Sequence, residues 1–413
     1  MDVNFKMDKL EKVKQILDKN NCKYLLDYTN ILNEQEREEF FNKILEIDFQ
    51  KQKELFEQTK KIENSKEDDV KPVNVILPEN LTLEEKEKYE LIGKEIIKEG
   101  KLAIVTLAGG QGTRLGHTGP KGTYKIVEDK SLFEILCDNL NEACKKYDTQ
   151  INWYIMTSKE NYKDTVDFFE THNYFNYPKE NVIFFKQNDY PMNLLNGEIF
   201  LGDHKKIKTG ADGHGGTFDA MLISRILKDI KKKNIKWIYV TPVDNPLIEL
   251  VDSLFVGIAE TENYDVLSKS VEKIDPNQKS GVFALKDDRV RVLEYTEISP
   301  DLMTKVNNDG SLFLRYAHIN CNLFNISSIE KLLKIEIPYH IAKKKATYIN
   351  KEGNVIVPEI PNAYKYEKFI FDYFPYLEKV GIYNVNRKLE YEPVKSSAQN
   401  AKEAYLNKIG GKR

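Results

Sequence analysis

Cysteine is scarce in this sequence. Its 413 residues include only four, and none stands in a CxxC pair or at a spacing typical of zinc ligands: Cys22, Cys137, Cys144 and Cys321. A disulfide framework or a structural zinc site needs cysteines that are closer together or more numerous, so neither is expected to organise the fold. The pattern favours reduced thiols and a cytoplasmic location.

Long apolar runs and an excess of positive charge are also missing. No stretch approaches the roughly 20 apolar residues of a membrane span. The first twelve residues, MDVNFKMDKLEK, lack the apolar centre of a signal peptide. The formal net charge is −3, from 62 Lys and Arg against 65 Asp and Glu. Nucleic-acid binders need a basic excess to neutralise phosphates, so we expect neither a membrane nor a nucleic acid as partner.

A glycine-rich segment at 102–123, LAIVTLAGGQGTRLGHTGPKGT, dominates what the sequence does contain. It begins with a short apolar, partly β-branched run, which predicts a buried strand. The glycines that follow permit a tight turn with exposed backbone N–H donors. Arg114 and Lys121 add a planar cationic fork and a mobile point charge, so the segment suits a polyphosphate.

The segment also has a simpler interpretation, an ordinary glycine-rich turn between a strand and a helix, and alone it does not decide between the two. Two well-known phosphate-binding motifs do not fit. A P-loop would need Ser or Thr directly after Lys121, where Gly122 stands. A dinucleotide-binding turn would need GxGxxG, whereas the spacing here is Gly110-x-Gly112-x-x-x-Gly116.

From residue 101 onward, strand-like runs alternate with helical patterns, which predicts an α/β fold with a mainly parallel sheet. The clearest predicted strands are 152–156, 182–185 and 237–241. Earlier residues show apolar side chains at helical spacing. We therefore predict a smaller helical N-terminal lobe over 1–98, a main domain over 99–385 and a short C-terminal segment over 386–413.

Polar residues follow several of these strands. Gln187 follows 182–185, and Asp244 with Asn245 follows 237–241. Ligands of open α/β sheets bind beyond the carboxyl ends of the strands, so one cleft is expected to collect these residues and the glycine-rich loop. Asp244 has two interpretations, the cap of a helix beginning near Leu247 or a carboxylate ligand of Mg²⁺. Asp212 is a weaker metal candidate, because Asp is common in glycine-rich turns.

One family matches these features closely. AGGQGTRLG followed by PKG resembles the signature of the eukaryotic UDP-N-acetylhexosamine pyrophosphorylases, which are related to UDP-glucose and UDP-sugar pyrophosphorylases. Further blocks follow in the family's order across roughly residues 99–395: WYIMTS at 153–158, ENVIFFKQ at 180–187, ADGHGG at 211–216, VDN at 243–245, SGVF at 280–283, LEYTEIS at 293–299, KYEKFIFD at 365–372 and EPVK at 392–395. The resemblance implies a Rossmann-like α/β nucleotidyltransferase domain, flanked by a smaller N-terminal domain.

It also implies a reaction. A uridylyltransferase of this kind makes UDP-N-acetylglucosamine and pyrophosphate from UTP and N-acetylglucosamine 1-phosphate, reversibly, with Mg²⁺ or Mn²⁺. On this basis we expect Asp244 to hold the metal and Arg114, Lys121 and Lys395 to be catalytic. The expected substrate-binding residues are Leu107, Ala108, Gly109, Gly110, Gln187, Gly213, His214, Asn245, Gly281, Glu294, His318, Lys365, Phe369 and Phe371.

Several of these residues have plainer interpretations. Lys365 and Lys395 are lysines of a type that is more often solvated, and Gln187 alone would be a surface amide. Phe369 and Phe371 alternate in FIF as strand residues, so one face is expected to pack in the core. The other face is expected to meet the sugar's N-acetyl group, as the resemblance implies.

The sequence departs from the family pattern at two site positions. His214 replaces the Asn of the family's DGNGG, and His318 replaces a second expected Asn, both where the family touches the sugar. The GHG run also resembles UDP-glucose pyrophosphorylases, so glucose or galactose 1-phosphate stays open as the substrate. A non-catalytic UDP-sugar-binding protein is the more distant alternative. Only eighteen residues follow Lys395, so we expect the C-terminal β domain of longer relatives to be largely absent.

Overall fold

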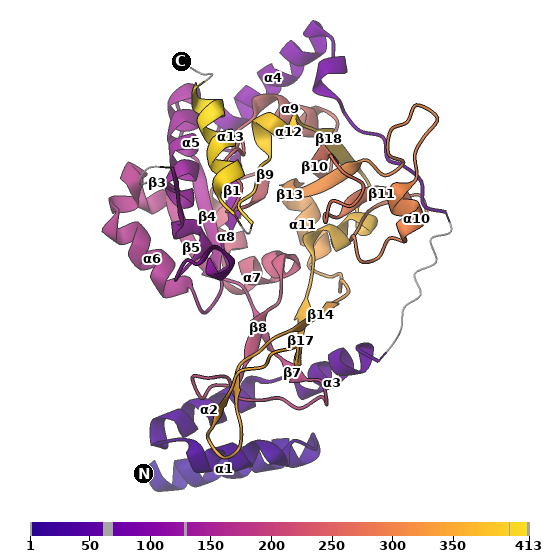
Figure 1. Ribbon diagram of the computed structural model, residues 1–413. Coiled ribbons are helices and arrows are strands. Elements are labelled where there is room, and N and C mark those ends of the chain that lie inside the picture. Colours follow the sequence, from indigo (N-terminus) through magenta and orange to yellow (C-terminus); the bar gives the residue numbers. More distant parts are fainter. Residues whose placement is uncertain (1, 61–68, 128–129, 396, 411–413) are drawn as a thin grey trace. The chain divides into compact units, whose positions relative to one another are not determined.

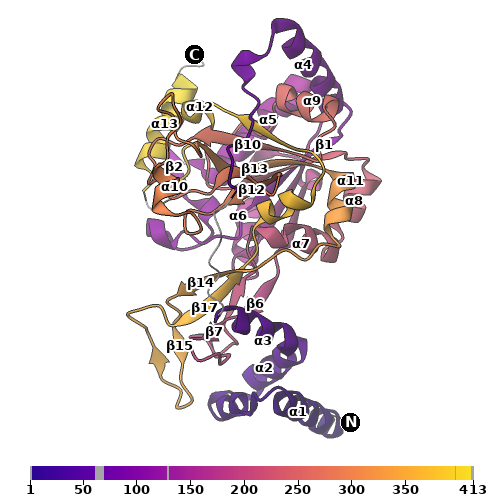
Figure 2. The ribbon, with the colours of Figure 1, turned by 90° about the vertical axis from the view of Figure 1, so that its right-hand side faces the viewer.

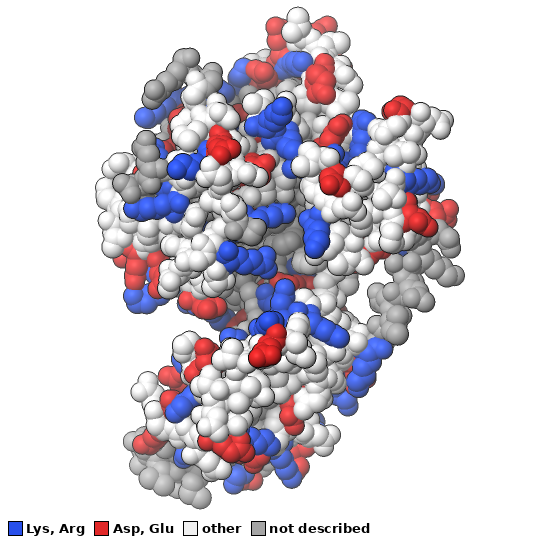
Figure 3. All heavy atoms as spheres, viewed as in Figure 1, with Lys and Arg blue, Asp and Glu red and all other residues white. Residues whose placement is uncertain are grey.

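The structure, a computed structural model, describes residues 2–60, 69–127, 130–395 and 397–410. The chain divides into two compact units (Figure 1). The small unit comprises Met1–Asn64, Asn188–Gly213 and Pro338–Phe369, and the large unit comprises Ser65–Gln187, His214–Ile337 and Ile370–Arg413. No helix among the described residues is long and apolar enough to span a bilayer. Lys and Arg lie interspersed with Asp and Glu over the visible surface of each unit (Figure 3).

A large mixed sheet forms the centre of the large unit. Four of its strands run parallel to one another: β1 (Leu102–Leu107), β4 (Asn152–Thr157), β5 (Val182–Lys186) and β9 (Trp237–Pro242). β1, β4 and β9 are almost entirely buried, as expected where both faces of a parallel sheet are covered, whereas β5 at the end of the strand order is only partly buried. The remaining strands are β10 (Val266–Glu272), β11 (Val282–Lys286), β12 (Arg289–Leu293), β13 (Tyr316–Asn325) and β18 (Val380–Asn384). The predicted α/β fold class is confirmed.

Helices cover both faces of this sheet. Leu323 of β13 packs in one cluster with residues of α4 (Leu83–Lys98), α5 (Leu132–Tyr147) and α9 (Ser253–Thr261). Successive strand residues point to opposite faces. Accordingly, the ring of Phe324 contacts Phe218 of α7 (Thr217–Ile223), with 5.0 Å between ring centroids. The helices α6 (Tyr162–Thr171) and α8 (Ile226–Lys232) complete the layers.

The close packing of α4 on α9 depends on glycine. The two helices lie side by side in both views (Figures 1 and 2). A Cβ on Gly93 of α4 would lie 1.8 Å from the carbonyl oxygen of Ser253. A Cβ on Gly257 of α9 would lie 1.7 Å from the carbonyl oxygen of Tyr89. Only two facing glycines let these backbones approach so closely.

Among its described residues, the small unit joins three α-helices and the 3₁₀ helix Lys23–Ile31 to short strands. The α-helices are α1 (Asp2–Lys19), α2 (Glu34–Glu46) and α3 (Phe49–Gln58). The strands are β6 (Asp189–Pro191), β7 (Asn193–Leu194), β8 (Thr209–Ala211), β14 (His340–Lys344), β15 (Tyr348–Ile349), β16 (Val355–Ile356) and β17 (Ala363–Glu367). Apolar side chains of α1 and α2 pack against Ile199, Leu201 and Ile207, which lie far along the sequence.

The two units divide the chain at other positions than the predicted domains do. α4, which lies before residue 99, belongs to the large unit through its contact with α9. Segments 188–213 and 338–369, from the middle of the predicted main domain, belong to the small unit. The last helix, α13 (Gln399–Gly410), packs in the large unit through Ala401. Helical periodicity reveals an apolar face, but not which distant segment covers it.

Candidate active site

The glycine-rich loop leaves β1 at Leu107 and is closed by its own backbone. The Ala108 N–H donates to the carbonyl oxygen of Met156 at 2.7 Å, which extends the pairing of β1 with β4. Further along, the Lys121 N–H donates to Gly110 O at 3.0 Å, and the Gly112 N–H donates to Gly119 O at 2.9 Å. The two ends of the loop are therefore joined, and Lys121 is held close to its glycines.

A buried asparagine that the sequence reasoning did not identify supports this loop. Asn161 is fully buried, and its Nδ2 donates to Ala108 O at 2.9 Å and to Gly110 O at 3.3 Å. Its Oδ1 accepts from the Ser158 N–H at 2.9 Å, and its N–H donates to Ser158 Oγ at 3.1 Å. Ser158 directly follows β4, and Asn161 stands three residues later. This spacing is that of a capping box and was the available sequence signal.

Gln187 lies directly against the loop. Its side chain is buried, and its backbone N–H donates to Thr157 O at 2.8 Å, which continues β5 beside β4. A Cβ on Gly109 would lie 2.5 Å from Gln187 Nε2. The amide can therefore reach the loop only because position 109 has no side chain. β1, β4, β5 and β9 are parallel, so their carboxyl ends meet at one edge and bring these groups together.

Lys121 and Asp244 form an ion pair at this edge. Lys121 Nζ lies 2.6 Å from Asp244 Oδ2, and the two side chains are 18% and 26% exposed. The interpretation of Asp244 as a helix cap is wrong: turns follow it, and the next helix, α9, begins at Ser253 with Asp252 as its cap. Arg114 is exposed, and no described residue forms a hydrogen bond or ion pair with its guanidinium.

The C-terminal segment that carries Lys395 is fastened to the same place. The Val394 N–H donates to Asp244 O at 2.8 Å, and the exposed Lys395 is the next residue. Asn245 is fully buried, and its Nδ2 donates to Glu390 O at 2.7 Å. Asn245 Oδ1 accepts from the Glu392 N–H at 3.2 Å. The amide of Asn245 therefore binds protein backbone.

Both histidines that depart from the family pattern contact one phenylalanine. The ring centroid of Phe371 lies 6.0 Å from that of His214 and 5.3 Å from that of His318. The His318 N–H donates to Gly281 O at 2.9 Å, and a Cβ on Gly281 would lie 3.0 Å from Glu294 Oε1. These five residues, all predicted from the resemblance, form one connected group in the large unit.

His318 is held in its neutral form by burial. Burial among aromatic rings, of Phe283, Phe371 and Phe374, lowers its pKa to about 4, and its bond to Asn322 Oδ1 at 3.0 Å only partly offsets this. A free histidine titrates near physiological pH, whereas the pKa of His318 lies well below that range because the side chain is buried.

A pH dependence of stability follows from this pKa. The unfolded chain binds a proton at His318 below about pH 6.5, while the folded chain does so only near pH 4. The free energy of unfolding should therefore fall as pH drops through this window, by on the order of 3 kcal/mol. Urea unfolding of wild type and His318→Asn from pH 7 to pH 4.5 measures this. The wild type should lose more stability than the variant, and parallel profiles would contradict the assignment.

Three predicted residues belong to the small unit. Lys365 Nζ pairs with Glu367 Oε1 at 2.8 Å. Gly213 has a φ of +80°, and a Cβ there would lie 2.4 Å from Lys368 O. Phe369 stacks on His340, with 4.2 Å between centroids.

The expectation that FIF is a strand is wrong. β17 ends at Glu367, and Ile370–Tyr376 is a 3₁₀ helix. Backbone hydrogen bonds of Lys368 to Asp212 O and of Ile370 to His214 Nδ1 hold the chain here in place of a sheet partner.

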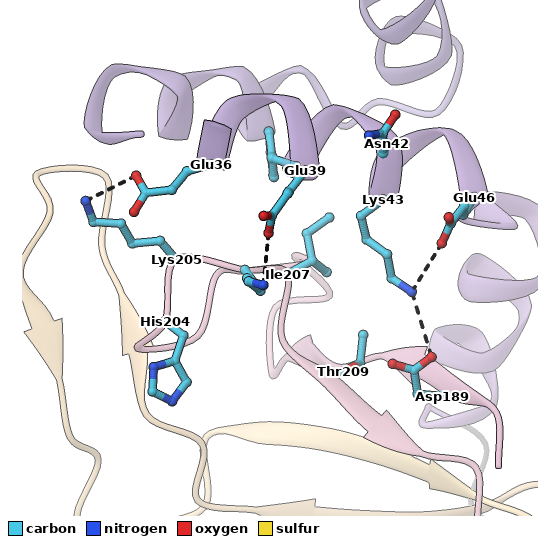
Figure 4. A pocket seen from close by; sticks show the side chains of 12 residues that line it. Glu36, Glu39, Asn42, Lys43, Glu46, Asp189, His204, Lys205, Ile207 and Thr209 are labelled. Atoms are coloured by element: carbon cyan, nitrogen blue, oxygen red, sulfur yellow. Dashed lines mark hydrogen bonds and ion pairs between the residues drawn. The ribbon is translucent and has the colours of Figure 1, made fainter. Parts of the chain in front are cut away.

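A separate pocket of about 390 Å³ lies within the small unit between α2 and the 204–209 segment (Figure 4). It contains none of the predicted site residues. Its charged side chains pair with one another, including Lys205 with Glu36 at 3.4 Å and Lys206 with Glu39 at 2.9 Å. We interpret these ion pairs as contacts that hold α2 against the 204–209 segment.

The fold and the loop together define an α/β protein with a closed glycine-rich loop and a Lys–Asp ion pair at the carboxyl edge of its parallel strands. The family model described as UTP--glucose-1-phosphate uridylyltransferase matches residues 38–401. The chain is 36% identical to the UDP-N-acetylglucosamine pyrophosphorylase of Saccharomyces cerevisiae, covering 75% of this chain and 67% of that protein. It is 34% identical to the human UDP-N-acetylhexosamine pyrophosphorylase-like protein 1, covering 76% of this chain and 64% of that protein.

A solved structure agrees with these matches. The uridine diphosphate N-acetylglucosamine pyrophosphorylase of Trypanosoma brucei, in complex with an inhibitor, superposes with a TM-score of 0.80 at 25% identity, covering 97% of this chain and 84% of that one. This chain belongs to the UTP--glucose-1-phosphate uridylyltransferase family. The family predicted from its motifs is confirmed. The chain spans about two thirds of the length of the two sequence relatives named above.

Proposed function

We propose that the protein is a uridylyltransferase that forms UDP-N-acetylglucosamine and pyrophosphate from UTP and N-acetylglucosamine 1-phosphate. The names of its relatives support this substrate pair. The observation that carries the proposal is a cluster of charge at the carboxyl edge of the sheet. There the closed glycine loop holds Lys121 on Asp244, and the backbone of Asp244 holds the segment that ends in Lys395. The four free cysteines support a cytoplasmic location.

The reaction needs no side-chain nucleophile. An ionised oxygen of the sugar phosphate attacks the α-phosphorus of UTP, a new P–O bond forms, and the α–β bridging bond breaks in line to release pyrophosphate. Catalysis then consists of positioning and charge stabilisation. Arg114 and Lys121 bind the β- and γ-phosphates and stabilise the charge on the leaving group. Lys395 offsets charge at the α-phosphate.

The remaining predicted residues bind the two substrates. Backbone groups of Leu107, Ala108, Gly109 and Gly110, together with Gln187, bind the uridine. Gly281, Glu294, His214, His318 and Phe371, all of the large unit, contact the sugar. For Gly213, Lys365 and Phe369 of the small unit, the roles that the family resemblance implies stay predictions. Asn245 acts on this site through the backbone that it binds.

The residues at Asp244 fit a divalent cation. Its carboxylate is a hard oxygen ligand, and the ammonium of Lys121 at 2.6 Å shows that the position already accommodates a positive charge. Asp244 would hold Mg²⁺ or Mn²⁺, which neutralises phosphate oxygens when bound.

Incubating the full chain with UTP, Mg²⁺ and N-acetylglucosamine 1-phosphate tests the proposal. Mass spectrometry should detect UDP-N-acetylglucosamine and an equal amount of pyrophosphate. UDP-N-acetylglucosamine with pyrophosphate should regenerate UTP in the reverse direction. Binding of UDP-N-acetylglucosamine without turnover in either direction would instead indicate a non-catalytic binding protein.

A second candidate is the same chemistry on glucose 1-phosphate, which the description of the family model and the histidine at 214 favour. Each histidine replaces an amide and can donate one hydrogen bond when neutral. We expect N-acetylglucosamine 1-phosphate to be a substrate, with looser discrimination against glucose 1-phosphate than the family pattern would give.

Restoring asparagine at both positions should therefore sharpen the preference for the acetylated sugar. The double variant His214→Asn, His318→Asn is expected to gain roughly 1–3 kcal/mol of discrimination, the scale of a polar contact in a binding site. The measurement is kcat/KM for the two sugar phosphates in wild type and variant. An unchanged ratio would show that these histidines do not set specificity.

A further inference from the structure

We propose that Asn245 and the buried ion pair of Lys269 with Glu390 are positioning residues that set Lys395 beside Asp244. The inference rests on the proposed function, in which Lys395 meets the α-phosphate. It assigns a role to three polar side chains that lie away from the phosphates and that the reaction does not use directly.

Alternating backbone groups of the C-terminal segment are bound by two consecutive residues. Asn245 binds the carbonyl of Glu390 at 2.7 Å and the N–H of Glu392 at 3.2 Å, and Asp244 O accepts from the Val394 N–H at 2.8 Å. Three hydrogen bonds therefore fix residues 390–394 alongside residues 244–245. Because the last of them ends one residue before Lys395, the position of that lysine depends on all three.

The side chain of Glu390 anchors the start of the same segment. Lys269 is fully buried on β10, with its Nζ 2.6 Å from Glu390 Oε2 and 3.5 Å from Asp252 Oδ2. Burial lowers the pKa of this ammonium, but the negative charges of Glu390 and Asp252 outweigh burial and raise it well above its usual range. Lys269 is thus a cation in the folded protein, and its charge balances the neighbouring carboxylates of Glu390 and Asp252.

Apolar packing supports the far end. Val394 is fully buried in a cluster with Ile126 and Leu132, and Leu115 of the phosphate loop packs against that cluster. The segment therefore binds the backbone of the residue that would hold the metal and packs in the same cluster as the loop that would hold the β- and γ-phosphates. A shift of the segment by even 1 Å would misplace Lys395, and errors of this size can cost about 100-fold in rate.

A double-mutant cycle with Lys395 separates positioning from general stability. Asn245→Ala should lower kcat by about 10- to 100-fold in the wild type, and by less than about 3-fold in a Lys395→Ala background. Glu390→Gln, which keeps the side-chain shape, should show the same pattern. Matched controls are Asn80→Ala, at an exposed asparagine, and Glu90→Gln, in an exposed ion pair with Lys94. Both controls should leave kcat unchanged.

Amide hydrogen exchange provides a readout that does not depend on activity. The N–H groups of Glu392 and Val394 should be protected in the wild type and should exchange at least 10-fold faster in Asn245→Ala, while the amides of β1 and β9 keep their protection. The inference would be overturned if Asn245→Ala lowered kcat by the same factor in the wild type and in the Lys395→Ala background. Unchanged amide exchange at Glu392 and Val394 would overturn it as well. If Asn245→Ala does not fold, Glu390→Gln decides by the same two measurements. A wild type without turnover would refute the proposed function, while exchange would still test the anchoring.

Discussion

Replacing Lys121 with alanine is expected to lower kcat by about 100-fold or more while leaving the fold intact. The backbone N–H of Lys121 holds this residue on the closed glycine loop, and its ammonium lies beside Asp244 at the carboxyl edge of the sheet, where we propose that it meets the phosphates. Losing one preorganised charge contact to a transition state typically costs about 10²–10³ in rate. Arg114→Ala should have an effect of the same size, because its exposed guanidinium has no partner among the described residues and is available to the leaving pyrophosphate.

Steady-state kinetics measures the kcat of both variants, and circular dichroism checks that each variant is folded. Lys98→Ala, at an exposed lysine of α4, is the matched control and should retain full activity. The two variants should differ in stability. Arg114→Ala removes no contact with a described residue, whereas Lys121→Ala leaves the partly buried carboxylate of Asp244 without its ammonium. A folded variant with near-normal turnover would remove that residue from the mechanism.

Asp244→Asn is expected to produce the second large loss of activity. We also expect the activity of the wild type to require Mg²⁺ or Mn²⁺. The substitution keeps the size of the side chain but removes the charge that would bind the cation and that now pairs with Lys121. Activity should fall by about 100-fold or more, and the affinity for Mn²⁺ in the presence of UTP should fall with it.

Two observations would contradict this account in different ways. Full turnover by EDTA-treated wild type would exclude a role for the metal. If the asparagine variant instead stays active with Mg²⁺ present, the ligand is a different group. Electron paramagnetic resonance of Mn²⁺ reads the binding step independently of turnover. Glu90→Gln, on the surface of α4, is the control for loss of a carboxylate and should change neither measurement.

The strands and their common edge were predictable from local sequence. The predicted strands 152–156, 182–185 and 237–241 correspond to Asn152–Thr157, Val182–Lys186 and Trp237–Pro242. Apolar runs of this length are local signals, and the rule that ligands gather at the carboxyl edge of parallel strands then placed Gln187 and Asp244 near the glycine loop.

What the sequence did not reveal depends on distant pairings. The neighbourhood of Asn161 shows a capping-like spacing, but not that its amide binds the carbonyls of Ala108 and Gly110. Lys269 looks like any strand lysine until the fold buries it against Glu390. The FIF segment alternates like a strand, yet bonds from residues 368 and 370 to residues 212 and 214 stop the sheet at Glu367. Such tertiary contacts override local pattern.

The most direct test of the central claim is kcat/KM of the full chain for N-acetylglucosamine, glucose and galactose 1-phosphates, with UTP and Mg²⁺, followed by pyrophosphate release. The proposed function predicts measurable UTP-dependent turnover with N-acetylglucosamine 1-phosphate. It also predicts that kcat/KM is highest for that sugar phosphate. A protein that uses only glucose 1-phosphate, or none of the three, would contradict it.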